Sequence, residues 1–394
     1  MTETVYIISA VRTAIGGFGG TLRDKRPGEL AATVTRAAIE RARVDAAQVG
    51  HVVFGQVIPT KPGDAYLGRV AAIGAGVPQE TPAMTVNRLC GSGLQAIVSC
   101  AQSLLLGDCD VAVGGGAEVM SRAPFLSPAT RWGHKMGNAV LVDALSGALT
   151  DPFGGILMGV TAENVAKRYG ISRDRQDALA LQSQQRAARA SAEGRFAGQI
   201  VAVEVKSRGR SKSFDTDEHI RPQTTAEDLS ALRPMFSDDG GTVTAGNASG
   251  INDGASAVVL ATEKAVSRYQ LTPIARIVAY GHAGVDPAYM GIGPVPATRI
   301  ALERAGLGVG DLDVIEANEA FAAQACAVAD QLGFDPDKVN PNGSGIALGH
   351  PVGATGAIIT SKLVHELQRS GGRYGLATMC IGGGQGIAMI VERV

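Results

Sequence analysis

The sequence has few aromatic residues and no excess of charge. Phe, Trp and Tyr make up 4% of the 394 residues, and 36 Lys and Arg nearly balance 37 Asp and Glu, which leaves a net charge of −1. Such a chain has no general positive field for a nucleic acid or an anionic membrane surface. Because hydrophobic residues make up 45% and charged residues 19%, a largely disordered chain is excluded as well.

Long hydrophobic runs and disulfide patterns are also missing. The uncharged stretch at residues 91–107 is interrupted by Gly, Ser and Gln and is too short for a membrane span. The N-terminus has no basic segment of the kind that opens a secretory signal. The five cysteines are Cys90, Cys100, Cys109, Cys326 and Cys380. Their number is odd and no pair has CxxC spacing, so we expect reduced thiols in a cytoplasmic protein without a zinc site.

Glycine, in contrast, is abundant, at 52 residues. A chain of this length and composition fits an α/β protein of two or three domains with many tight turns. Apolar segments at residues 5–8, 51–55 and 110–113 predict buried strands, and the amphipathic segment 28–42 predicts a helix. The alternation of such elements predicts a parallel or mixed sheet with helices on its faces.

The chain repeats part of itself. Residues 35–42 match residues 298–305 at six of eight positions, with an offset of 263, and the same offset places segment 49–55 on segment 312–318. Two amphipathic helices of similar composition would explain the first match, but the agreement over helix, turn and strand favours a duplication. A looser similarity joins two glycine triplets that each follow an apolar strand, residues 114–116 and 382–384. Two similar halves that face each other would form a site where they meet.

The region between the repeats differs from them in composition. A long polar helix is predicted to start at Ser172 and to end at Gly194, and an alternating basic stretch follows at residues 206–212. This region has no counterpart elsewhere in the chain and is not of low complexity, so we interpret it as an inserted subdomain. The basic stretch is interpreted as a solvated edge strand, with attraction of phosphate as the alternative.

Cys90 lies where a glycine-rich turn enters a predicted helix. The helix is predicted by apolar residues at helical spacing, which are Leu94, Ile97, Val98, Ala101, Leu104 and Leu105. The partial positive charge of a helix N-terminus favours thiolate over thiol, so we expect the pKa of Cys90 to be lowered. A buried structural cysteine is the alternative, since that is the commoner role of a single cysteine.

His350 and Asn318 are candidate polar groups. His350 lies among the glycines of residues 342–356, just before a proline and a new helix, and the glycines leave space around its imidazole. A hydrogen-bonded core histidine is the alternative. Asn318 ends a segment whose counterpart in the repeat ends at Gly55, so only the second copy carries a polar side chain there. Capping of the following helix would also explain this asparagine.

Cys380 and Gly382 complete the set of candidates. Cys380 follows a strand predicted at residues 374–379, and the N–H of Gly382 can face a developing oxyanion. A triple glycine also occurs in phosphate-binding turns. Together these groups suit acyl transfer, because a thiolate can accept an acyl group, a histidine can move its proton and a second thiol can act as a base toward carbon.

Four motifs carry a resemblance over essentially the whole chain: NRLCGSG at residues 87–93, NEAFA at 318–322, GHP at 349–351 and CIGGG at 380–384. In this order they resemble the thiolase family, and within it bacterial acetyl-CoA acetyltransferases and broad-range β-ketothiolases. The resemblance implies an α/β fold with two duplicated βαβαβαββ halves, a five-layer αβαβα core and an inserted loop domain. It divides the chain into an N-terminal half (1–121 and 252–271), a CoA-binding loop domain (122–251) and a C-terminal half (272–394).

The resemblance also implies a reaction. Thiolases catalyse reversible Claisen condensation of acetyl-CoA with an acyl-CoA, or CoA-dependent thiolysis of 3-ketoacyl-CoA, in fatty acid metabolism including β-oxidation. By motif, Cys90 becomes acylated, His350 activates it, and Cys380 exchanges the α-proton of acetyl-CoA. One oxyanion hole would comprise His350 and Asn318 acting through a water, and the other the N–H groups of Cys90 and Gly382. No metal or redox cofactor is implied, and such enzymes are usually homotetramers built as dimers of dimers.

The resemblance assigns coenzyme A to the loop domain. Arg221 would approach the adenine and 3′-phosphate end, and Ser249, with Ala245 in the same motif, would bind the pantetheine arm. The arm and the acyl pocket would be lined by Phe236, Met158, Met290, Ala320 and Phe321. Many acetoacetyl-CoA thiolases have histidine where this chain has Leu157. The difference favours wider or longer acyl chains.

Three other functions are alternatives. A ketoacyl synthase of the same superfamily would lack a base at Cys380, because it obtains its carbanion by decarboxylation. A non-catalytic acyl-CoA-binding or lipid-binding protein would not need all four polar groups. A nucleotide-binding oxidoreductase is expected to carry GxGxxG after its first strand, and this chain does not.

Overall fold

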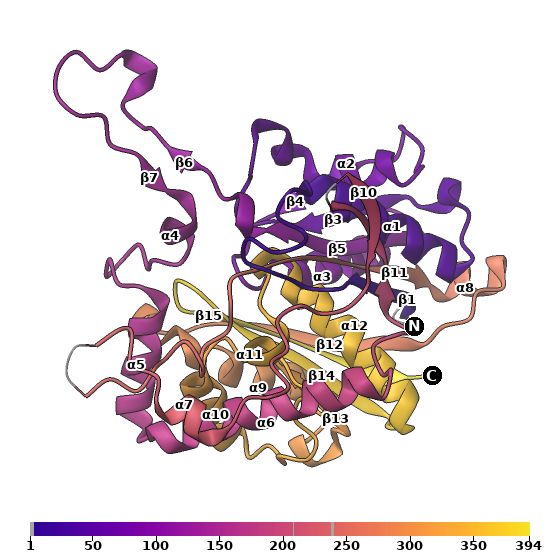
Figure 1. Cartoon of the computed structure of the whole chain (residues 1–394). Helices are drawn as coiled ribbons and strands as arrows, with labels where there is room; N and C mark the ends of the chain where they lie inside the picture. Colours follow the sequence, from indigo (N-terminus) through magenta and orange to yellow (C-terminus); the bar gives the residue numbers. More distant parts are fainter. Residues whose placement is uncertain (1–3, 208, 238–239) are drawn as a thin grey trace.

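The computed structural model describes residues 4–207, 209–237 and 240–394, which form two similar α/β halves with a region inserted into the first (Figure 1). The elements of the N-terminal half are β1 (Val5–Thr13), β2 (Gly16–Gly17), α1 (Pro27–Ala42), β3 (His51–Gly55), α2 (Leu67–Gly74), β4 (Ala83–Val86), α3 (Ser92–Leu106), β5 (Val111–Val119), β11 (Asn252–Thr262) and α8 (Glu263–Tyr269). Those of the C-terminal half are β12 (Ala275–Gly284), α9 (Pro294–Ala305), β13 (Val314–Ala317), α10 (Ala322–Leu332), α11 (Gly345–Leu348), α12 (Val352–Ser370), β14 (Tyr374–Ile381) and β15 (Gln385–Arg393).

One continuous sheet runs through both halves in the order β13-β14-β15-β12-β1-β11-β5-β3-β4. The halves join where β1 pairs antiparallel with β12, at Tyr6↔Arg276 and Ile7↔Ala275. Helices α1 and α2 cover the outer face of the N-terminal part, α9 and α10 cover that of the C-terminal part, and α3 and α12 lie between the two parts (Figure 1). The predicted five-layer arrangement is therefore confirmed, with its two sheets joined edge to edge.

The duplication extends through the sheet and the central helices. In the parallel pair β3–β5, His51 is opposite Ala112, and in β13–β14 Val314 is opposite Gly375, so both partners keep the offset of 263. The central helices touch reciprocally: a Cβ on Gly93 would lie 2.8 Å from the backbone N of Ala357, and a Cβ on Gly356 would lie 2.3 Å from that of Leu94. Because 356 and 357 are 93 and 94 plus 263, this crossing is a local pseudo-twofold axis.

Two expectations about the repeat are corrected by the structure. The glycines at 114–116 lie inside β5 rather than at its end, and the strand register relates them to 377–379, not to the turn at 382–384. Glycine is required there by helix packing, since a Cβ on Gly116 would lie 2.1 Å from the carbonyl oxygen of Gly353 in α12. In addition, the third strand of the second half is represented, among the described residues, by the single bridge Ile315↔Val339.

The inserted region packs on both halves: α5 and α6 contact α10 of the C-terminal half, whereas β8 pairs with β1 and the hairpin β9–β10 joins the core of the N-terminal half. Its elements are β6 (Phe125–Leu126), β7 (Val142–Asp143), α4 (Ala144–Ala148), α5 (Met158–Tyr169), α6 (Arg173–Ala192), β8 (Ile200–Val201), β9 (Val203–Ser207), β10 (Arg210–Phe214) and α7 (Ala226–Ser230). The long polar helix is confirmed as α6, whose N-cap Ser172 accepts a hydrogen bond from the backbone N of Arg175. The basic stretch falls on the hairpin β9–β10, apart from residue 208, which lies outside the described residues; the first four residues of β10 are exposed, which confirms a solvated strand there.

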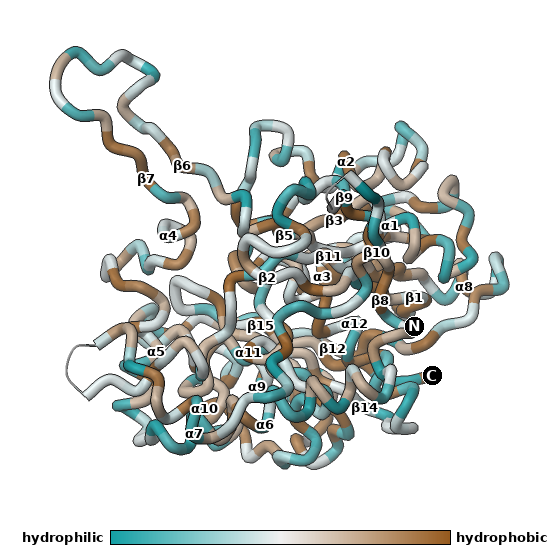
Figure 2. The backbone as a smooth tube through the Cα atoms, in the orientation of Figure 1, coloured by the Kyte–Doolittle hydropathy of each residue, from teal (hydrophilic) through white to brown (hydrophobic). Residues whose placement is uncertain are grey.

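An extended arm leaves the body of the molecule between β5 and α5. It carries β6 and β7, and its tip projects away from both halves (Figure 1), whereas α4 at its base packs on the cluster of Val57, Ile58, Met120 and Val352. The hydropathy colouring shows apolar residues along the arm (Figure 2). Its exposed large apolar side chains are Phe125, Leu126, Trp132, Met136, Val140, Leu141 and Val142, with Trp132 88% and Met136 90% exposed.

Helix α3 belongs to an apolar stretch. Residues Leu89–Leu106 are long and apolar enough to cross a membrane by length and composition. In this fold the helix lies between the two halves, where Leu94 and Ile97 are fully buried in the central core. Its apolar character is therefore accounted for by the packing of the middle layer.

Candidate active site

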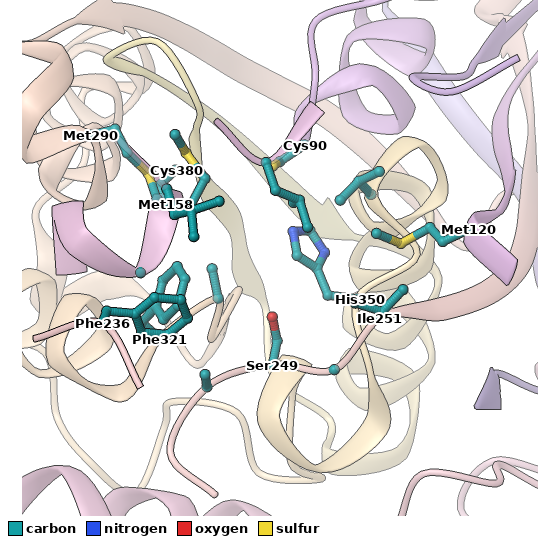
Figure 3. Close-up of a pocket in the computed structure, with 17 residues that line it drawn as sticks. Cys90, Met120, Met158, Phe236, Ser249, Ile251, Met290, Phe321, His350 and Cys380 are labelled. Carbon is teal, nitrogen blue, oxygen red and sulfur yellow. The ribbon is translucent and has the colours of Figure 1, made fainter. Parts of the chain in front are cut away.

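A pocket of about 820 Å³ lies where the two halves and the inserted region meet (Figure 3). It brings together Cys90, His350 and Cys380, three of the candidate catalytic residues. It is also lined by most of the residues expected to contact substrate, which are Leu157, Met158, Phe236, Ser249, Met290, Ala320 and Phe321. Segments far apart in the sequence thus converge on one cavity that contains two thiols and one imidazole.

Cys90 is held in a tight turn before α3. Leu89 has a left-handed backbone with φ of 46°, and the Ser92 hydroxyl donates to the Leu89 carbonyl oxygen at 2.6 Å. Burial raises the pKa of Cys90, and the charge of Glu118 adds to this, while the N–H groups of Gly382 and Cys90 act in the opposite direction. The predicted lowering of the pKa by the helix N-terminus is therefore wrong, because desolvation is the larger effect. Cys90 rests as a thiol and needs a base.

His350 is oriented so that one ring nitrogen is free. Its Nδ1 lies 2.7 Å from the Thr355 hydroxyl, which donates its proton to the Pro351 carbonyl oxygen at 2.9 Å. Since the hydroxyl has one proton, it must accept from Nδ1–H, and the network assigns the lone pair to Nε2. Nε2 is buried and has no partner among the described residues. Burial lowers the pKa of His350 to about 4, so the ring is neutral at pH 7.

Cys380 is the more buried of the two thiols. It lies at the end of β14, paired with Gly386 of β15, and packs with Met158, Met290 and Ala320. Burial raises the pKa of Cys380, and a charge on Cys90 raises it further. The two thiols are thus close enough to influence each other, and neither is ionised at rest.

Asn318 follows β13 and is 1% exposed, but it is not among the residues that line the pocket. Neither Oδ1 nor Nδ2 of its side chain has a hydrogen-bond partner within the described parts of the chain. A buried amide without partners is costly, so both atoms of this side chain are available to bind a further group. Capping is excluded as an explanation, because the N-cap of α10 is Phe321.

Two of the residues expected to contact coenzyme A lie outside the pocket. Arg221 and Ala245 line a neighbouring groove of about 1230 Å³, which shares Gly250 with the pocket. Ser249 lines the pocket, and its backbone N donates to the Ala320 carbonyl oxygen at 2.9 Å. The groove and the pocket are therefore adjacent at Gly250.

Sequence reasoning missed two residues of the site. Thr355 fixes the tautomer of His350, and its only signal was its place in the same glycine-rich motif. Glu118 is 0% exposed beneath the pocket, and a carboxylate within an otherwise apolar, glycine-rich strand was a signal that could have been noticed. In the part of the chain that the structure describes, no group of three or more His, Cys, Asp or Glu residues could hold a metal ion.

The fold and the pocket define an acyl-transferring enzyme that uses cysteine chemistry at the junction of two duplicated halves. Comparison with known families agrees: residues 5–264 match the thiolase N-terminal domain and residues 271–393 match the thiolase C-terminal domain. The chain belongs to the thiolase family. It is therefore an acetyl-CoA C-acyltransferase, whose reaction is Claisen condensation or thiolysis of acyl-CoA.

Individual relatives are similar over their full length. The chain is 65% identical over 394 residues to beta-ketothiolase BktB of Cupriavidus necator, covering 100% of both chains. It is 52% identical to an acetyl-CoA acetyltransferase of Chromobacterium violaceum, covering 99% of both. Its structure superposes on a crystal structure of human mitochondrial 3-ketoacyl-CoA thiolase in complex with CoA with a TM-score of 0.97, at 46% identity, covering 100% of this chain and 98% of the other. The alternative assignment to a nucleotide-binding oxidoreductase is thereby excluded.

Proposed function

We propose that the enzyme works through an acyl-Cys90 intermediate and accepts 3-ketoacyl-CoAs both at and beyond four carbons. The observation that carries the proposal is the free Nε2 of His350, which opens into a cavity with two un-ionised thiols. The names of its relatives, a beta-ketothiolase and 3-ketoacyl-CoA thiolases, support the substrate range. Initial rates of thiolysis on C4 to C10 3-ketoacyl-CoAs, run beside acetyl-CoA condensation, test it.

The first half-reaction transfers an acyl group to sulfur. His350 Nε2 takes the proton of Cys90, and Sγ attacks the thioester carbonyl. The N–H groups of Cys90 and Gly382 stabilise the resulting oxyanion, which is supported by their position next to Cys90 Sγ. The proton then returns from His350 to the leaving CoA sulfur, so that the acyl-enzyme forms with His350 neutral again.

The second half-reaction forms the carbon–carbon bond. Cys380 gives its proton to His350 Nε2 and, as a thiolate, removes the α-proton of acetyl-CoA; the enolate oxygen is stabilised by the protonated His350 and by the amide of Asn318 acting through a water. The unpartnered amide atoms of Asn318 support this role. The carbanion attacks the acyl carbonyl on Cys90, the C–S bond breaks, His350 returns its proton to the Cys90 sulfur, and the 3-ketoacyl-CoA leaves. Thiolysis is the same sequence in reverse.

Coenzyme A lies along the path from the groove to the pocket in this proposal. Arg221 is exposed at the groove and meets the phosphate end, while Ser249 meets the pantetheine arm. Phe321 and Phe236 enclose the arm, with their rings edge to face and 6.5 Å apart. No metal or redox group takes part in the proposed steps.

The assembly is proposed to be a homotetramer, and the chain is proposed to divide at residues 121/122, 251/252 and 271/272. The exposed apolar side chains of the arm support self-association, because a contiguous apolar surface of this kind marks a contact site. The return of the chain into the first half through β11, next to β5, supports the boundary after the insertion. A cytoplasmic location stays a prediction from the free cysteines.

Acyl-enzyme formation is expected to persist at mildly acidic pH. A pKa of about 4 leaves nearly all His350 neutral at pH 5.5, whereas an ordinary imidazole with a pKa of about 6.5 would leave about a tenth. The rate of labelling by acetyl-CoA, measured in quenched single-turnover experiments between pH 5 and 8, should therefore show no decrease centred near pH 6.5. The variant His219→Asn, in the neighbouring groove, is the control and should keep the same profile. A decrease centred near pH 6.5 would contradict the assigned base.

Leu157 is expected to let the enzyme accept 3-ketoacyl-CoAs with longer acyl chains. It is 43% exposed, precedes α5 and lines the pocket. Each methylene that meets this apolar surface contributes up to about 0.8 kcal/mol, enough to change kcat/KM several-fold per carbon pair. Leu157→His should lower the C6-to-C4 ratio of kcat/KM. Leu232→His in the groove is the matched control and should affect all chain lengths alike; an unchanged ratio in Leu157→His would show that the leucine contacts only the pantetheine.

A further inference from the structure

A buried carboxylate joins the two halves directly beneath the pocket. Glu118, in β5, is 0% exposed, and its oxygens accept three backbone N–H bonds: from Val57 at 2.8 Å, from Ile58 at 3.1 Å and from Gly353 at 3.0 Å. Val57 and Ile58 follow β3 of the first half, and Gly353 lies in the first turn of α12 of the second. One side chain thus ties the loop after β3 to the helix that His350 precedes.

The pseudo-twofold relation shows what is unusual about this carboxylate. The offset of 263 relates Cys90 to Gly353 and Glu118 to Ile381. At the α12 N-terminus, a Cβ on Gly353 would lie 2.4 Å from Oε2 of Glu118, so glycine leaves room for the carboxylate. At the α3 N-terminus, a Cβ on Gly91 would lie 2.5 Å from Cδ1 of Ile381. One helix N-terminus therefore meets an internal carboxyl group, and its counterpart, with an isoleucine in that place, carries the nucleophile.

Two consequences reach the reacting groups. Gly353 is three residues from His350, and the Thr355 hydroxyl that fixes the imidazole is in the same turn, so the carboxylate anchors the segment that aims Nε2. The charge of Glu118 also acts on Cys90 and raises its pKa. We propose that Glu118 is a positioning residue of the thiolase reaction, which holds the His350 segment in place against Cys90; this rests on the proposed roles of both residues.

The pKa of Glu118 depends on its burial, on its hydrogen-bond donors and on the ionisable groups of neighbouring elements. Burial raises the pKa of Glu118 to about 8, the three N–H groups lower it in part, and Asp253 on the adjacent strand β11 raises it. The ionisable neighbours from the elements packed against it are thus Asp253 on β11 and Cys90 before α3. Asp253 itself accepts a hydrogen bond from the backbone N of Ser121, in the loop after β5, so it is a matched buried carboxyl group that does not bind the N-terminus of α12.

The test compares Glu118→Gln, Glu118→Asp and the control Asp253→Asn. The side chain of Gln cannot accept all three N–H bonds, so kcat for condensation should fall about 10- to 100-fold with KM for acetyl-CoA nearly unchanged. Aspartate keeps both acceptor oxygens but is one methylene shorter, so kcat should fall less than in Glu118→Gln, again with KM nearly unchanged. Asp253→Asn should change neither kcat nor KM.

Several outcomes would overturn the proposal. These are a kcat of Glu118→Gln within about twofold of the parent enzyme, a rise in KM in place of the fall in kcat, or a fall in kcat of the same size in Asp253→Asn, which would be a structural effect only. If circular dichroism shows that Glu118→Gln does not fold, Glu118→Asp replaces it in the test: a lower kcat with an unchanged KM supports the proposal, and a raised KM with an unchanged kcat overturns it. Failure of the proposed function is seen separately, because labelled acetyl-CoA would then modify a residue other than Cys90 in the parent enzyme.

Discussion

Replacing Cys90 with alanine is expected to abolish the acyl-enzyme and both directions of the reaction. The thiol shares its pocket with the free Nε2 of His350, and loss of a covalent nucleophile commonly lowers kcat by about 10³-fold or more. Incubation with radiolabelled acetyl-CoA, acid quench and peptide mapping should find label on Cys90 of the parent enzyme and none on the variant. Condensation and thiolysis rates should fall together, because both pass through the same intermediate.

The matched control is Cys326→Ala. Cys326 is buried in α10 and lines a different cavity, so its replacement should leave labelling and both rates close to those of the parent enzyme. Label on another cysteine, or undiminished label in Cys90→Ala, would remove Cys90 from the mechanism. Far-UV circular dichroism of both variants separates loss of chemistry from loss of fold.

The repeat and several helices could be predicted from the sequence alone. The repeat at an offset of 263 predicts two similar halves, and the register of β3–β5 and β13–β14 keeps that offset. Helix α3 and the polar helix α6 follow from apolar spacing and a serine cap. Such features depend on residues close in the chain, so their pattern can be recognised without the fold.

Long-range contacts could not be predicted in this way. The glycines at 114–116 suggested a strand end, but they allow α12 to approach β5, and only the packed structure shows that contact. The pKa of Cys90 was expected to be lowered by its helix, whereas burial by the second half raises it. Glu118 went unnoticed because its three partners come from segments that are 60 or more residues away in sequence.

The two halves differ at the loop that follows their second strand. In the first half β3 ends at Gly55 and the N–H groups of the next loop bind Glu118, whereas the position that matches Gly55 is the unpartnered Asn318, directly after β13. Ala320, in that second loop, lines the pocket with Cys380. One loop is thus held by an internal carboxyl group, while the other borders the pocket.

Cys380 has a resting state that depends on Cys90. Burial raises the pKa of Cys380, and a charge on Cys90 raises it further. Acylation prevents Cys90 from ionising, so no thiolate at Cys90 can oppose the ionisation of Cys380 once the acyl-enzyme has formed. Proton removal from the α-carbon is therefore expected to follow acylation, and the two thiols are expected to be separable by mutation.

The variant Cys380→Ser should accept acetyl groups from acetyl-CoA but fail to exchange the α-hydrogens. Serine preserves the shape of the side chain, but its hydroxyl is a far weaker acid than a thiol, so the base is lost while Cys90 and His350 keep their geometry. Labelling of Cys90 should stay within a few-fold of the parent enzyme, and deuterium incorporation into acetyl-CoA in D₂O, followed by mass spectrometry, should fall about 10²- to 10⁴-fold. Cys100→Ser, a buried cysteine on α3 outside the pocket, is the control and should exchange normally. Parent-like deuterium incorporation by Cys380→Ser would assign the carbon-acid step to another group, and loss of labelling together with exchange would give Cys380 a part in acyl transfer instead.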